Sequence, residues 1–203
     1  GKVNFGPWSE DAEVDIDTLK SVKSPKAVFF PQSENLYTCE REGRKLKVEL
    51  EALKEQRFTV FGMRACDVQG VKVLDQVFLA DPVDSFYAAR REHGTMVAIA
   101  CHEPEESCFC KVFGIDCAEP AADVAAWFAG EELYWKALTE KGQTLTEILS
   151  GLLTDADAKD EKKLSEEQTA IRAIVEKLPY SHLSLEGWDR NATETRFDSP
   201  LWE

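Results

Sequence analysis

The placement of four cysteines constrains this chain more than any other feature of its sequence. Cys66 follows the apolar run at residues 58–62, and Cys101 follows the run at residues 95–100. Short apolar runs that end in small or turn-forming residues are typical of buried parallel strands. We therefore expect two strands whose carboxyl ends open into cysteine-bearing loops.

The two loops together provide four thiols. If the strands are neighbours, their loops lie at the same edge of the sheet, where α/β folds usually place ligands. Cys108 and Cys110, in the second loop, complete the set. Four thiolates hold an iron–sulfur cube or a tetrahedral zinc ion. Structural zinc sites usually contain Cys-x2–4-Cys pairs, which this set lacks, so the spacing favours a cluster. The alternative for a cysteine at a strand end, such as Cys101, is a small buried hydrophobe.

The residues around these cysteines match this chemistry. Cys66 directly precedes Asp67, a predicted N-cap, and the positive end of a helix favours the thiolate form. Arg64 adds a cation, although an ion pair with a nearby aspartate is the simpler role. Phe109 and Phe113 are expected to shield a cluster from water, which influences its reduction potential.

The remaining cysteines and histidines have a weaker claim to the site. We interpret Cys39 as a strand-end residue and Cys117 as a spare thiol one loop later. His102 is more simply a solvated neighbour of Cys101 than a ligand. His93 and His182 lack a carboxylate or serine arrangement around them and are assigned no catalytic role.

The composition limits the class of protein. The 203 residues, 43% of them hydrophobic, fit one sizeable domain or one domain with appendages. Thirty-eight acidic residues against 24 basic ones give a net charge of −14, which argues against binding to a phosphate backbone. No signal peptide and no apolar run of membrane-spanning length is visible, so we expect a cytoplasmic protein. Six cysteines in such a chain indicate metal or redox chemistry rather than a disulfide framework.

The hydrophobic periodicity predicts an α/β fold with a mostly parallel or mixed central sheet, flanking helices and an antiparallel hairpin. A strand–helix–helix–strand order is clearest between residues 58 and 100, with Val68, Val71, Leu74, Val77 and Phe78 on one helical face. The other expected elements are a strand at 27–31, hairpins at 36–50 and 124–138, a turn at 139–142 and helical sequence at 148–178. We divide the chain into a surface arm (1–24), a cysteine-bearing α/β domain (25–150) and a helical extension with a tail (151–203).

Several motifs occur together in an order that is typical of one family. They are FGMRACD at 61–67, GVKVLD at 70–75, Tyr87 with RRExG at 90–94, and Cys101 followed by Cys108-Phe109-Cys110. With them, the chain resembles the N-terminal region of the iron–sulfur electron-transfer subunit of sulfhydrogenases (the β subunit) and of anaerobic sulfite reductase (the A subunit), in the 4Fe-4S dicluster-domain family. The resemblance covers about residues 25–145 and the SPLWE segment at 199–203.

The resemblance implies a set of ligands and a neighbouring module. The matching cysteines, Cys66, Cys101, Cys108 and Cys110, would be the ligands of a [4Fe-4S] cluster, while Cys39, Cys117 and His93 fall outside the pattern. In that family a Pro-x-Trp-acidic segment leads into a ferredoxin-like module with two further [4Fe-4S] clusters. This chain stops at Glu203, immediately before that module, as expected of a fragment or of a natural split of the gene.

The resemblance also implies a function in which this chain relays electrons without performing bond chemistry. A flavin subunit would exchange electrons with NAD(P)H, and another subunit would reduce protons, sulfur or sulfite. Three alternatives remain: a metal-free docking module for partner subunits, a zinc-stabilised structural domain, and a domain that itself binds flavin or nucleotide. The last ranks lowest because the sequence has no GxGxxG or Walker loop.

Overall fold

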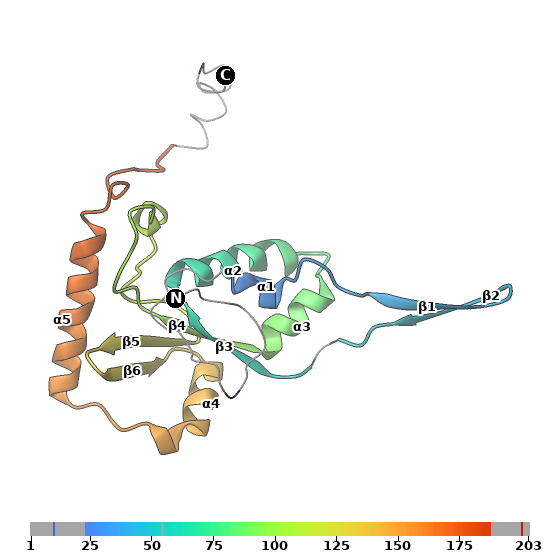
Figure 1. The fold of residues 1–203 in the computed structure, drawn as a ribbon, viewed down its shortest axis with the longest axis horizontal. Coiled ribbons are helices and arrows are strands. Elements are labelled where there is room, and N and C mark those ends of the chain that lie inside the picture. The colour runs from blue at the N-terminus through green and yellow to red at the C-terminus, as the bar shows by residue number, and fades with distance from the viewer. Residues whose placement is uncertain (1–9, 11–22, 54, 188–199, 201–203) are drawn as a thin grey trace.

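A four-stranded mixed sheet forms the centre of the fold (Figure 1). The computed structural model describes residue 10, residues 23–53, residues 55–187 and residue 200. The strands lie in the order β3 (Phe58–Met63), β4 (Gly94–Ile99), β5 (Val124–Ala129) and β6 (Glu132–Ala137). The first three are parallel and β6 is antiparallel to β5. The predicted mixed α/β fold is confirmed, whereas most of the arm expected at residues 1–24 and of the segment at 199–203 lies outside the described residues.

Two helices connect β3 to β4 as the sequence predicts. They are α2 (Ala65–Phe78) and α3 (Ser85–His93). Val68 and Val71 of α2 are buried in one cluster with Met96 and Ala98 of β4. Val77, expected on the same face, is 62% exposed. At 100° per residue it lies about 120° around the helix from Val71, and so falls outside the buried stripe.

Alternate residues of the inner strands contact helices on opposite faces of the sheet. Met96 and Ala98 face α2, while Val97 and Ile99 pack with Leu145 on the other side. In Figure 1 this places α2 above the sheet and α4 (Glu140–Ile148) below it. The long helix α5 (Ala158–Val175) packs Ile171 and Val175 against Trp127 of β5. After α4, a short 3-10 turn, η2 (Ser150–Leu152), leads toward α5.

The apolar run before Pro31 is a helical turn, α1 (Lys26–Phe29), and the expected strand at 27–31 is wrong. A run this short carries no periodicity that distinguishes a strand from a helix. Pro25 has φ −61°, which suits the first turn of a helix, and the helix buries only Phe29. Its neighbours Val28 and Phe30 remain 43% and 41% exposed.

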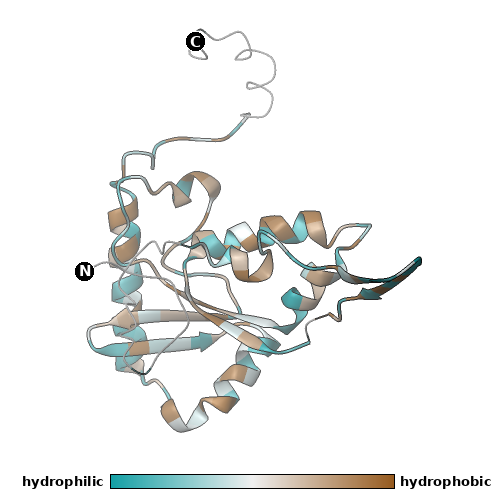
Figure 2. Cartoon of the chain, turned by 45° about the vertical axis from the view of Figure 1, so that its right-hand side comes forward, coloured by the Kyte–Doolittle hydropathy of each residue, from teal (hydrophilic) through white to brown (hydrophobic). Residues whose placement is uncertain are grey.

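The predicted hairpin at 36–50 is confirmed as β1 (Tyr37–Glu42) and β2 (Lys45–Leu50), but it does not join the central sheet. All of its strand residues are exposed, and it projects from the body of the molecule (Figures 1 and 2). The register pairs Tyr37 with Leu50 and Cys39 with Val48. Directly opposed residues share a face, so one side of the hairpin is largely apolar.

The turn predicted at 139–142 is instead the beginning of α4, so this prediction is wrong. Thr139 is the N-cap, and its side chain accepts a hydrogen bond from the N–H of Gly142. Close packing, and not a turn, explains the glycine at position 142. A Cβ atom at this position would lie 2.1 Å from the carbonyl oxygen of Asp123.

Candidate functional site

The two cysteine loops open at the same edge of the sheet. β3 and β4 are parallel neighbours, with Met63 paired to Ala98 near their carboxyl ends. Cys66 follows the end of β3, and Cys101 follows the end of β4. The expectation that these strands are adjacent is confirmed, because the parallel pairing places both carboxyl ends on one side.

Cys66 lies in the first turn of α2, at the positive end of the helix. The N-cap is Arg64, so the predicted N-cap, Asp67, is wrong by three residues. Asp67 sits inside the first turn, and its carboxylate accepts a hydrogen bond from the backbone N–H of Arg64 at 3.2 Å. Cys66 is exposed to solvent at this end of the helix.

Cys110 contacts Cys66 from the other loop. Cys110 begins a short 3-10 helix, η1 (Cys110–Phe113). Its thiol donates a hydrogen bond to the sulfur of Cys66, and this bond lowers the pKa of Cys66 to about 7. The same bond and partial burial raise the pKa of Cys110. Above about pH 7 the pair therefore holds one thiolate and one proton.

Cys101 and Arg64 occupy the buried side of the site. Cys101 is 6% exposed, and burial raises the pKa of its thiol to about 12, against the opposing charge of Arg64. Arg64 is itself buried, and its Nη1 donates a hydrogen bond of 3.3 Å to the carbonyl oxygen of Ala100. Cys108 is half-buried and interacts electrostatically with Cys101. A buried cation thus lies where thiolate charge would collect.

Cys117, interpreted from the sequence as a spare thiol, lies beside Cys101 in the structure. The N–H of Cys101 donates to the carbonyl oxygen of Cys117 at 3.0 Å, and Cys117 is 4% exposed. Burial raises the pKa of its thiol to about 11, and its charge interacts with those of Cys108 and Cys66.

Thiolates are the ligands that both an iron–sulfur cube and a zinc ion use. Within the described part of the chain, no three His, Cys, Asp or Glu side chains converge closely enough to hold a metal ion.

The other residues considered from the sequence have different roles. Phe109 and Phe113 contact each other with ring centroids 5.6 Å apart, but both rings are more than half exposed. They do not form the expected shield. Cys39 lies on the exposed hairpin, and the Nδ1 atom of His93 is 2.8 Å from the carbonyl oxygen of Ala89. His102, beside Cys101, is half-buried.

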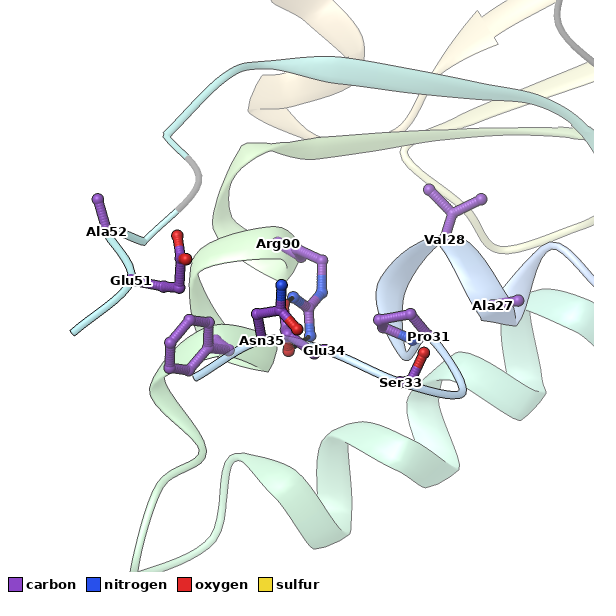
Figure 3. Close-up of a pocket in the computed structure, with 10 residues that line it drawn as sticks. Ala27, Val28, Pro31, Ser33, Glu34, Asn35, Glu51, Ala52 and Arg90 are labelled. Carbon is purple, nitrogen blue, oxygen red and sulfur yellow. Dashed lines mark hydrogen bonds and ion pairs between the residues drawn. The ribbon is translucent and has the colours of Figure 1, made fainter. Parts of the chain in front are cut away.

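A separate pocket of about 650 Å³ lies between α1, α3 and the end of β2, and no cysteine lines it (Figure 3). Arg90 lies in this pocket beside Glu34 and donates to both of its carboxylate oxygens. Arg91 forms a second pair with Asp75 at 2.7 Å. Both arginines are ion-paired and tie α3 to its neighbours.

The comparison with known proteins agrees with the motifs. Over 112 residues, 55% of its length, the chain is 31% identical to sulfhydrogenase 2 subunit beta of Pyrococcus furiosus. The predicted resemblance to the sulfhydrogenase β subunit is confirmed. The matched region covers 32% of that subunit, so this chain corresponds to about a third of its relative. No family model matches the chain, and no solved structure matches it. None of the helices in the described residues has the length and apolar character needed to cross a membrane.

Proposed function

We propose that this chain is an electron-transfer part of a multi-subunit cytoplasmic oxidoreductase and binds one [4Fe-4S] cluster through Cys66, Cys101, Cys108 and Cys110. The observation that carries the proposal is the meeting of the two cysteine loops at the carboxyl ends of β3 and β4. The similarity to a sulfhydrogenase β subunit supports it independently of the geometry.

The similarity to a sulfhydrogenase β subunit also suggests which subunits would be the partners of this chain. Electrons would pass between a flavin subunit that oxidises NAD(P)H and a catalytic subunit such as a hydrogenase, sulfur reductase or sulfite reductase. The helical segment from residue 151 and the tail beyond it would lead toward a ferredoxin-like module. A bound cluster would supply one-electron redox chemistry at the edge of the sheet.

The chain's own residues prepare the site for this role. The helix end at Cys66 and the hydrogen bond from Cys110 favour a thiolate before any metal binds. The guanidinium of Arg64 lies on the buried side and offsets negative charge at Cys101.

The test is anaerobic reconstitution of the chain with ferrous iron and sulfide, followed by iron, acid-labile sulfide and visible absorption measurements. We expect about four irons and four sulfides per chain and a brown colour that dithionite bleaches. Cys66→Ala and Cys110→Ala should lose both iron and colour. Cys39→Ala removes a thiol from the exposed hairpin and should change neither.

The other outcomes of the reconstitution experiment each support one of the alternative functions. A colourless protein that contains zinc and unfolds on chelation would establish the zinc-stabilised domain. A protein that takes up neither metal would leave the docking module as the better function. The exposed apolar face of the β1–β2 hairpin favours that second candidate, because an uncovered two-stranded hairpin is only marginally stable alone.

A further inference from the structure

The hairpin of β1 and β2 has an open backbone edge along β2. Within the described part of the chain, β2 pairs with β1 and with no other strand. The N–H of Glu51 donates to the carbonyl oxygen of Leu36 at 3.0 Å, in continuation of the ladder. Antiparallel bonds of this kind recur at every second residue, so the odd-numbered residues of β2 bond to β1. The N–H and C=O groups of Leu46, Val48 and Leu50 therefore point outward, to the open edge.

The open edge is also apolar on one face. The side chains of Leu46, Val48 and Leu50 are 65%, 53% and 83% exposed. An exposed edge of this kind is a template for pairing with a further strand. A two-stranded hairpin is marginally stable alone, whereas three or more strands with an apolar face can support themselves. The hairpin therefore has both the backbone groups and the apolar face that an added strand needs.

The charges of β2 complement those of a second, antiparallel copy of β2. When the two strands are centred on Val48, Lys47 of one copy lies opposite Glu49 of the other. Lys45 likewise lies opposite Glu51, and the two leucines of the strand oppose each other. This register also sets the outward backbone groups of the even-numbered residues against one another. Opposite charges and apolar side chains in directly opposed positions stabilise a strand pair.

The alternative pairings place like charges together. A pair centred on Lys47 puts this lysine opposite its own copy, and a pair centred on Glu49 does the same with two carboxylates. The outer edge of β1 pairs no better with itself, because its polar face carries Thr38, Glu40 and Glu42 and no cation. Like charges directly opposite each other are destabilising. The charge pattern therefore favours self-pairing through the edge of β2, in one register.

The side chains of Lys47 and Glu49 are accessible for contacts with another copy. Within one chain they form an ion pair of 2.7 Å, but they are 64% and 60% exposed. An exposed pair of this kind contributes little to stability. Either side chain can therefore turn to a second copy at small cost.

We propose that two copies of this chain associate through antiparallel pairing of their β2 strands, about a two-fold axis at Val48. The two hairpins then form one four-stranded sheet whose apolar faces lie on the same side. Because each hairpin projects from its body (Figures 1 and 2), the two bodies lie at opposite ends of this sheet. The interface is small, so the dimer depends on protein concentration. This association does not depend on whether the cysteine site binds a cluster.

Proline variants of the opposed residues Cys39 and Val48 provide a matched test. Their N–H groups point outward from opposite edges of the hairpin, so neither proline removes a bond between β1 and β2. Sedimentation equilibrium of the 203-residue chain, with a thiol reductant present, measures the mass at protein concentrations up to about 1 mM. Wild type and Cys39→Pro should approach the mass of two chains, while Val48→Pro should keep the mass of one.

Charge variants test the register of the pair. Lys47→Glu alone sets carboxylates opposite each other, and Glu49→Lys alone sets lysines opposite each other, so each variant should be monomeric. In an equal mixture, the substituted residue of each variant faces an opposite charge on the other, and a mixed dimer should form. Glu166→Lys makes the same change of charge at an exposed ion pair of α5 and should leave the dimer intact.

Several results would overturn this association. One is a wild-type chain that keeps the mass of one chain at every concentration. Another is a Val48→Pro variant that is folded by circular dichroism and still dimerises. Assemblies larger than a dimer would indicate open pairing of β2 with β1 of the next copy instead. If Val48→Pro does not fold, the charge variants still decide, because failure to form a mixed dimer contradicts the register.

Discussion

The guanidinium of Arg90 binds both carboxylate oxygens of Glu34, a residue 56 positions earlier in the chain. It also donates through Nε to the carbonyl oxygen of Phe29 at 2.6 Å. The side chains of this pair are only 8% and 22% exposed. One arginine of α3 therefore fixes both α1 and the segment that leads into the hairpin.

Glu34→Gln should lower the free energy of unfolding by about 3 kcal/mol, because it leaves a buried guanidinium without its counter-charge. Urea denaturation at pH 7 measures this. The matched control is Glu49→Gln, whose partner Lys47 is 2.7 Å away in a pair that is 64% and 60% exposed. That change should cost less than about 1 kcal/mol. Equal losses in the two variants would contradict a structural role for the Arg90 pair.

The reactivity of Cys66 should follow an unusually low pKa. In the unloaded Cys39→Ser variant, which removes the other exposed thiol, the alkylation rate should rise through an inflection at pH about 7. The thiolate is the nucleophile, so reactivity is present above this pKa and lost below it. Adding Cys110→Ala removes the hydrogen-bond donor and should move the inflection upward. An inflection near 9.0 in both proteins would show that Cys110 does not stabilise the thiolate.

Gly142→Ala should destabilise the protein by about 1–3 kcal/mol, in the range found for overpacked positions. The added methyl group would lie 2.1 Å from the carbonyl oxygen of Asp123, so β5 or α4 must shift. Thermal unfolding followed by circular dichroism measures the loss. Gly151→Ala is the control, because a Cβ atom there meets nothing within 4 Å. A Gly142 variant as stable as the control would mean that α4 is not seated as described.

Stability should depend on the charge of Asp75 at acid pH. Although burial opposes it, hydrogen bonds from Arg91 and Tyr87 hold the pKa of this carboxyl below its usual range. A lowered folded-state pKa contributes stability that is complete above the unfolded value of about 4 and is lost as the pH falls through the folded one. Asp75→Asn should therefore be less stable at pH 7 by about 2 kcal/mol.

The comparison of pH 7 with pH 3 provides the control for that variant. Wild type should lose more unfolding free energy than Asp75→Asn between these two values, when urea denaturation is measured at both. Identical losses would show that Asp75 titrates with an ordinary pKa in the folded protein.

The sequence predicts the region from β3 to β6 well because its signals are local. Apolar runs mark the strands, and Gly130, with φ +69°, marks the turn between β5 and β6. The parallel pairing of β3 and β4 follows from the helices between them. The common edge for Cys66 and Cys101 follows in turn from that pairing.

The errors occur where contacts between distant residues decide the structure. Gly142 resembles a turn residue until the close approach of Asp123 is known. The position of Cys117 beside Cys101 is likewise not predictable from the sequence, because it depends on a backbone bond to Cys101 and on the indole of Trp127. The hairpin's alternation predicts its strands correctly, but alternation carries no information about what its apolar face contacts.

The connection between β4 and β5 contains only η1 where parallel strands usually have an α-helical crossover. It carries Cys101, Cys108, Cys110 and Cys117, and it is held at both ends only when β5 has paired with β4. During synthesis, the thiols of this loop can therefore take their places only after β5 has left the ribosome. Assembly of the proposed cluster would then be a late step in the maturation of the chain, and any delay in pairing β5 would leave the thiols of this loop exposed.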